Sequence, residues 1–91
     1  MASIFGHFDV GDYDAWKQGF DSDPAGRAQS GKGHRVYRSV ANPSEVFVSV
    51  EFGSAEDAQT FREGLLASGA LDRVTVKTEP TVVEEAESVE Y

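Results

Sequence analysis

The stretch Gly33–Phe52, GHRVYRSVANPSEVFVSVEF, decides the fold. It contains two runs that are rich in β-branched and aromatic residues, His34–Val40 and Glu45–Phe52. The four residues between these runs, Ala41–Ser44, include asparagine, proline and serine, which favour the backbone angles of a turn. The sequence therefore predicts a β-hairpin at the centre of a small sheet.

A strand and a helix are expected before the hairpin. Residues Ser3–Val10 alternate between two faces with a period of two, which predicts a strand. Asp12 suits the cap of a helix that follows, because three aromatic residues then recur at helical spacing. These residues are Tyr13, Trp16 and Phe20. Pro24 is expected to break the helix near Ser22, and a short helical turn follows up to Gln29.

A second helix and a fourth strand are expected after the hairpin. Ser54 is the expected N-cap of this helix, and Ser68–Gly69 closes it. Its buried stripe consists of Ala58, Phe61 and Leu65. The alternation over Arg73–Thr78 predicts the fourth strand, which Pro80 bends or ends. Residues 81–91 continue either as an edge strand or as a tail.

The predicted order of elements is strand, helix, two strands, helix and strand. This order is typical of an α+β fold of the ferredoxin-like kind, a βαββαβ chain with two helices on one face of a four-stranded antiparallel sheet. A chain of 91 residues suffices for one domain, so we expect a single domain over residues 1–91. Within it, residues 80–91 form an acidic C-terminal edge strand or tail.

The strands carry apolar residues on both faces. Val46, Val48 and Val50 are expected on one face, and Phe47 and Phe52 on the other. The helices cover one face only, and a chain of this size buries only about two-thirds of its unfolded surface. A second sheet packed on the open face would cover the remaining apolar residues. We therefore expect a homodimer.

The composition disfavours several classes of partner. Sixteen acidic and eight basic residues give a formal net charge of −8, and such a surface repels phosphate backbones and anionic lipids. We therefore expect neither a nucleic-acid nor a membrane partner. The absence of cysteines, of a basic leader segment and of any apolar run of about 20 residues favours a cytoplasmic protein.

The charge is unevenly distributed along the chain. Half of the basic residues lie within twelve positions at or before the hairpin: Arg27, Lys32, Arg35 and Arg38. The last thirteen residues carry five glutamates and no basic residue. Two interpretations stay open: a solvated acidic edge, or an acidic tail that contacts the basic hairpin across a dimer.

Four parts of the chain carry a family resemblance: Asp12–Phe20, Asp23–Arg27, Gly33–Arg38, and Val50–Phe52 with Ala58 and Phe61. Through them, residues 3–88 resemble the dimeric α+β barrel superfamily. Within it, the chain is similar to small bacterial proteins grouped with antibiotic-biosynthesis monooxygenases and polyketide cyclases.

The resemblance implies two ferredoxin-like subunits whose sheets meet face to face. It also implies a small-molecule cavity between the sheet and the helices of each subunit. The quinone-forming monooxygenases of this group use neither metal nor flavin, so the resemblance implies no cofactor. Their catalytic motif does not match this chain residue by residue, and no catalytic position is carried over from them.

Three strand residues are candidates for acid–base chemistry. The imidazole of His7 could take a phenolic proton, because histidine is the side chain that most often exchanges protons in catalysis. Arg35 and Tyr37 share one face of a strand and could hold an enolate or a carboxylate. The alternatives are a hydrogen-bonded histidine at a sheet interface, and cross-strand or rim pairs for the other two.

Four aromatic residues are candidates for the wall of a ligand pocket: Tyr13, Trp16, Phe20 and Phe61. Packing in the core is the alternative, because both roles draw on the same residues of a helix that faces a sheet. Arg27 is a candidate anion clamp, with a surface ion pair as its alternative.

The sequence offers no convincing metal or cofactor site. Several aspartates lie near Asp21–Asp23, but they lack the spacing of a calcium loop, and two histidines do not make a zinc or haem site. Two hypotheses about function therefore stay open. One is a cofactor-independent monooxygenase or cyclase that acts on an aromatic or polyketide-like ligand. The other is a non-catalytic dimeric module that binds a ligand or serves assembly.

Overall fold

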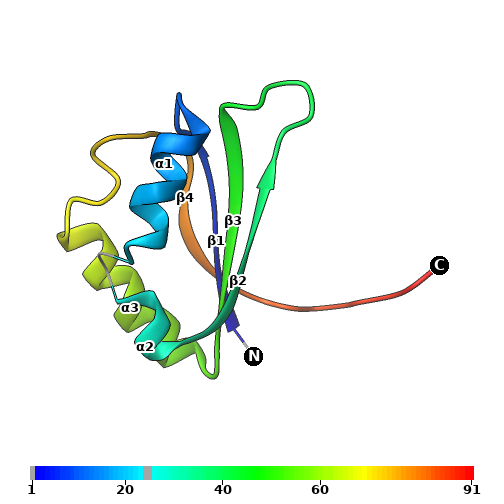
Figure 1. Ribbon diagram of the computed structural model, residues 1–91. Coiled ribbons are helices and arrows are strands. Elements are labelled where there is room, and N and C mark those ends of the chain that lie inside the picture. Colours follow the sequence, from blue (N-terminus) through cyan, green and yellow to red (C-terminus); the bar gives the residue numbers. More distant parts are fainter. Residues whose placement is uncertain (1, 24–25) are drawn as a thin grey trace.

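The computed structural model describes residues 2–23 and 26–91 (Figure 1). Its elements in chain order are β1 (Ala2–Asp9), α1 (Tyr13–Asp21), α2 (Arg27–Ser30), β2 (Gly31–Arg38), β3 (Glu45–Phe52), α3 (Ala55–Ala67) and β4 (Thr75–Glu84). Within these described ranges, no helix combines the length and the apolar character that crossing a lipid bilayer requires.

The four strands form one antiparallel sheet in the order β2-β3-β1-β4. Helix α1 lies in the connection from β1 to β2, and β3 lies between these two strands in the sheet. Helix α3 connects β3 to β4 in the same way, with β1 between them. The helices lie on one side of the sheet, as Figure 1 shows. The predicted α+β fold with a four-stranded antiparallel sheet is thus confirmed, with α2 as a third, short helix.

The core lies between the sheet and the helices. Its buried side chains come from alternate positions of the two central strands and from α3: Ala2, Ile4, Phe8, Val46, Val48, Val50, Phe52 and Ala58. The prediction for Phe52 was wrong, because this residue lies on the helix face with an exposed fraction of 0%. The alternation of β3 continues without a bulge to its last residue, so Phe52 keeps the parity of Val50. Its ring packs against Phe61 of α3 at 5.3 Å.

The predicted helix ends are confirmed by their caps. The carboxylate of Asp12 accepts hydrogen bonds from the backbone N–H groups of the first turn of α1, and Ser54 does the same for α3. Helix α1 ends at Asp21 with Ser22 as its C-cap, which agrees with the predicted break. Pro24, to which the break was attributed, lies outside the described residues.

Strand β4 continues through Pro80 to Glu84. Its register against β1 shifts on both sides of His7, so the strand is irregular where the proline interrupts the hydrogen-bond ladder. The carbonyl oxygen of Pro80 accepts a 2.6 Å hydrogen bond from Nε of Arg62, which ties the strand to α3. Residues 85–91 form no helix or strand and extend on the side of the sheet that faces away from the helices (Figure 1).

Candidate functional site

Helix α1 packs its aromatic residues against the core without burying them. None of the nine residues of α1 is buried, although the side chains of Tyr13, Trp16 and Phe20 all contact the core cluster. The ring of Trp16 lies 5.9 Å from that of Tyr13 and 5.0 Å from that of Phe20. Helix α3 differs, because its Ala58 is fully buried against the core. The aromatic stripe of α1 therefore faces space that side chains do not fill.

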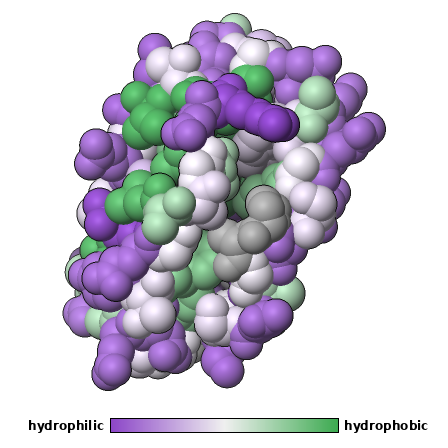
Figure 2. Space-filling view, turned by 90° about the vertical axis from the view of Figure 1, so that its left-hand side faces the viewer, coloured by the Kyte–Doolittle hydropathy of each residue, from purple (hydrophilic) through white to green (hydrophobic). Residues whose placement is uncertain are grey.

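A cavity of about 690 Å³ occupies this space between α1, α3 and the sheet. Trp16, Phe20 and Phe61 line it, together with buried residues of β1 and β3. Its volume lies within the range of about 300–1,000 Å³ that is usual for small-molecule sites. Figure 2, which views the helix side of the molecule, shows hydrophobic residues surrounded by hydrophilic ones on this side.

Three of the four predicted pocket residues thus meet at one cavity, and Tyr13 does not line it. The guanidinium group of Arg38 instead stacks over the Tyr13 ring in a cation–π contact, with its Cζ 4.2 Å from the ring centroid. A second hollow, of about 270 Å³, lies where the end of α3 approaches β4. Among the described residues, no aromatic side chain lines that hollow, so the larger cavity is the better candidate for an aromatic ligand.

Arg27 is the half-buried cation of the cavity. Its guanidinium lies over the ring of Phe20, with Cζ 3.7 Å from the ring centroid, and its Nη1 donates a 3.1 Å hydrogen bond to the carbonyl oxygen of Phe20. Arg73, in the turn before β4, also lines the cavity but is exposed. The sequence pattern placed Arg73 in a strand and gave no sign of this role. Arg27 begins the short helix α2 and Arg73 lies in a turn, so neither comes from the long periodic helices or the strands.

Asp23 fixes the position of Arg27. Its backbone has a positive φ of 55°, and its carboxylate accepts hydrogen bonds from the backbone N–H groups of Arg27 at 2.6 Å and Ala28 at 2.9 Å. The N–H of Ala28 is the largest influence that holds the pKa of the Asp23 carboxyl below its usual range. Burial opposes it, and the N–H of Arg27 and then the charges of Arg27 and His34 lower the pKa further. The carboxylate therefore caps α2, in which Arg27 is the first residue.

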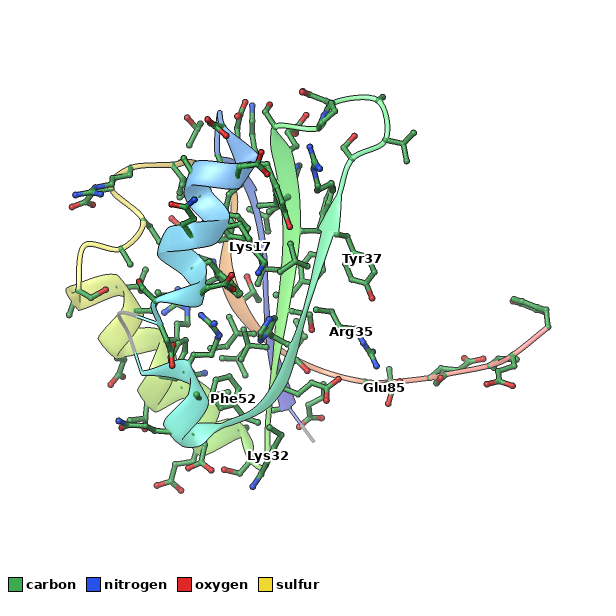
Figure 3. All side chains as sticks on the ribbon, in the orientation of Figure 1. Lys17, Lys32, Arg35, Tyr37, Phe52 and Glu85 are labelled. Carbon is green, nitrogen blue, oxygen red and sulfur yellow. The ribbon has the colours of Figure 1, made fainter. Side chains whose placement is uncertain are left out.

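His7, Arg35 and Tyr37 lie on the other face of the sheet. The register pairs His7 with Phe47 and Phe47 with Tyr37, so these side chains form a row across three strands. The imidazole of His7 stacks on Phe47 at 4.0 Å, and its Nε2 lies 2.9 Å from a carboxylate oxygen of Glu45. Arg35 is exposed and lies 3.9 Å from Glu51. Figure 3 shows Arg35 and Tyr37 directed away from the helices, whereas Phe52 lies on the helix side.

The sheet thus separates the two groups of predicted site residues. The aromatic pocket residues meet on the helix side, and the three candidates for acid–base chemistry meet on the open side. Over residues 2–23 and 26–91, no three His, Asp or Glu side chains gather in a way that could hold a metal ion. Neither the models of known protein families nor the curated proteins with which the sequence was compared give a match.

Proposed function

We propose that this protein is a homodimer that binds a small aromatic or polyketide-like molecule in the cavity between α1, α3 and the sheet. One observation carries the proposal: Trp16 and Phe20 of α1 line a cavity of about 690 Å³, and no residue of this helix is buried. Trp16, Phe20 and Phe61 offer ring faces to a flat ligand, and the apolar floor would exclude water from it.

The proposed subunit is ferredoxin-like, and two subunits form a dimeric α+β barrel through their open sheet faces. The strand order β2-β3-β1-β4 with its two split crossovers supports this fold. The open face supports the pairing, because Phe5 and Tyr37 remain 37% and 54% exposed on it and Phe47 is only half-buried. A second copy of the same face would cover these rings.

Ligand binding without catalysis is the version of the proposal that the geometry favours. His7, Arg35 and Tyr37 cannot touch a ligand in the cavity of their own subunit, because the sheet lies between them and it. Among the described residues that line the cavity, none is a histidine. A cofactor-independent oxygenation or cyclisation remains the second candidate, since in the proteins that the chain resembles the phenolate of the substrate itself is thought to react with oxygen.

The experiment uses Trp16 as its probe, because it is the only tryptophan of the chain and it lines the cavity. Anthraquinone-2-carboxamide is titrated against the protein, and saturable quenching of the tryptophan fluorescence is expected. Gly19 also lines the cavity, and a Cβ atom placed there meets no atom within 4 Å. Gly19→Leu is therefore expected to fold, to occupy part of the cavity and to weaken binding about tenfold or more.

Gly64→Leu is the matched control. Gly64 lies in α3, does not line the cavity, and also leaves open space for a Cβ atom. This variant is expected to bind the quinone as tightly as the unchanged protein. Absence of saturable quenching, or equal affinity of the Gly19→Leu and Gly64→Leu variants, would contradict the proposed site. Native mass spectrometry of protein from its own host would report the number of subunits and any retained ligand.

A further inference from the structure

We infer that the cavity selects an aromatic ligand that carries a carboxylate or a phenolate, and that Arg27 is the residue that binds this anion. The inference rests on the proposed function and adds the chemical class of the ligand. It follows from the way in which the Arg27 side chain is held, from the charges around it, and from the rings beside it.

The guanidinium of Arg27 is held in place before any ligand arrives. It stacks on Phe20 at 3.7 Å and donates from Nη1 to the carbonyl oxygen of Phe20 at 3.1 Å, and its side chain is 14% exposed. A guanidinium has five N–H donors, and among the described residues this carbonyl is its only hydrogen-bond partner. A side chain that is already ordered loses little entropy when it binds an anion.

The acidic groups near Arg27 compete weakly for its charge. The carboxylate of Asp23 lies 3.5 Å from Nη1, which is longer than the roughly 2.7–2.9 Å of a strong charged hydrogen bond. Both oxygens of Asp23 already accept backbone N–H groups. Asp12 also lines the cavity, and its Oδ1 accepts the backbone N–H groups of Asp14 and Ala15 at the N-terminus of α1.

The position of the cation relative to the aromatic residues sets the shape of the ligand. Because Arg27 lies on the ring of Phe20, and Trp16 lies 5.0 Å from that ring, an anionic group bound to Arg27 brings its own ring beside both. Arg73 adds a second cation to the lining. A neutral hydrocarbon of the same size would fill the cavity without using either charge.

The test compares two ligands that differ by one charge, anthraquinone-2-carboxylate and anthraquinone-2-carboxamide. The unchanged protein is expected to bind the carboxylate about 10- to 100-fold more tightly than the carboxamide. This is the gain in affinity expected from a hydrogen bond to a charged group in a partly enclosed site. Arg27→Gln is expected to abolish this preference and to leave the affinity for the carboxamide within a factor of about three. Lys77→Gln removes the same charge from an exposed site on β4 outside the cavity lining and is expected to keep the preference.

The outcomes separate this inference from the proposed function. If neither quinone binds, the proposed function fails. If both bind equally to the unchanged protein, or if Arg27→Gln keeps the preference for the carboxylate, the inference fails and the binding site stands. If Arg27→Gln weakens both ligands alike, Arg27→Lys decides: a retained preference for the carboxylate supports the anion site, and equal binding of the two ligands overturns it.

Discussion

At the scale of single residues, Asp23 shows how a local backbone conformation positions a functional group. It is the one non-glycine residue with a positive φ in the described part of the chain, a conformation that aspartate tolerates better than most residues. In this conformation its carboxylate reaches the N-terminus of α2, whose four residues would otherwise make a marginal helix. The cap in turn holds Arg27 at the cavity. The sequence predicted a helical turn here and offered Arg27 as a candidate anion clamp, but it could not predict that the side chain would stack on Phe20 beside a cavity.

The substitution Asp23→Asn is expected to lower the free energy of unfolding by about 0.5–1 kcal/mol near neutral pH, because the amide has one acceptor oxygen and one of the two hydrogen bonds is lost. Because the pKa of Asp23 is lowered in the folded state, its carboxylate stabilises that state fully at pH values above the ordinary pKa of 3.8. That contribution is lost as the pH falls through the lowered pKa. Urea unfolding of both proteins at pH 6 and in strongly acidic buffer measures the difference. A difference that does not shrink in acid would show that the charge has no part in the cap.

At the scale of elements, periodicity predicted the strands and the two long helices, because each has one face that packs against the core. The pattern could not decide which strand face the helices cover, since Phe5 and Phe8 make both faces of β1 apolar. The pattern therefore groups His7, Arg35 and Tyr37 with aromatic residues that lie across the sheet from them. The cavity itself was also beyond sequence patterns, because it depends on the distance at which α1 stands from the sheet.

The open face of the sheet gives the prediction at this scale. Phe5→Glu places a charge on the central strand β1, at a position that is 37% exposed in the subunit and covered in the proposed dimer. The variant is expected to sediment as a folded monomer, because burying an unpaired carboxylate would cost several kcal/mol. Val40→Glu is the control, since Val40 is fully exposed in the hairpin loop, and it is expected to remain dimeric. Sedimentation velocity distinguishes the two, and a dimeric Phe5→Glu protein would contradict the proposed interface.

At the scale of the whole molecule, the subunit has a small core for its length. In the part of the chain that the structure describes, eight hydrophobic side chains form the buried core, and a cavity adjoins them instead of further packing. A chain with so limited a core is expected to draw part of its stability from association. In the proposed dimer, the acidic segment 85–91 extends toward the partner, as its direction away from the helices suggests (Figures 1 and 3).

The midpoint of thermal unfolding, Tm, is accordingly expected to depend on protein concentration. By mass action, a roughly hundredfold rise in protein concentration raises the free energy of unfolding by about 2.7 kcal per mole of dimer. This corresponds to an increase in Tm of about 5–10 °C. Differential scanning calorimetry across that range measures it. The Phe5→Glu variant is expected to show a constant Tm. A constant Tm in the unchanged protein would mean that the subunit is stable by itself.

The irregular edge strand β4 affects whether further molecules can add strands to the sheet. Its pairing with β1 has two register shifts, and it contains a proline, which has no N–H group to offer to a further strand. Proteins use such interruptions to keep neighbouring molecules from adding strands to an open flank. The opposite flank, β2, carries Lys32 and Arg35, whose charges repel an identical strand laid alongside. Amyloid-like fibrils of this protein are therefore expected to require unfolding of the sheet and not to grow from the native fold.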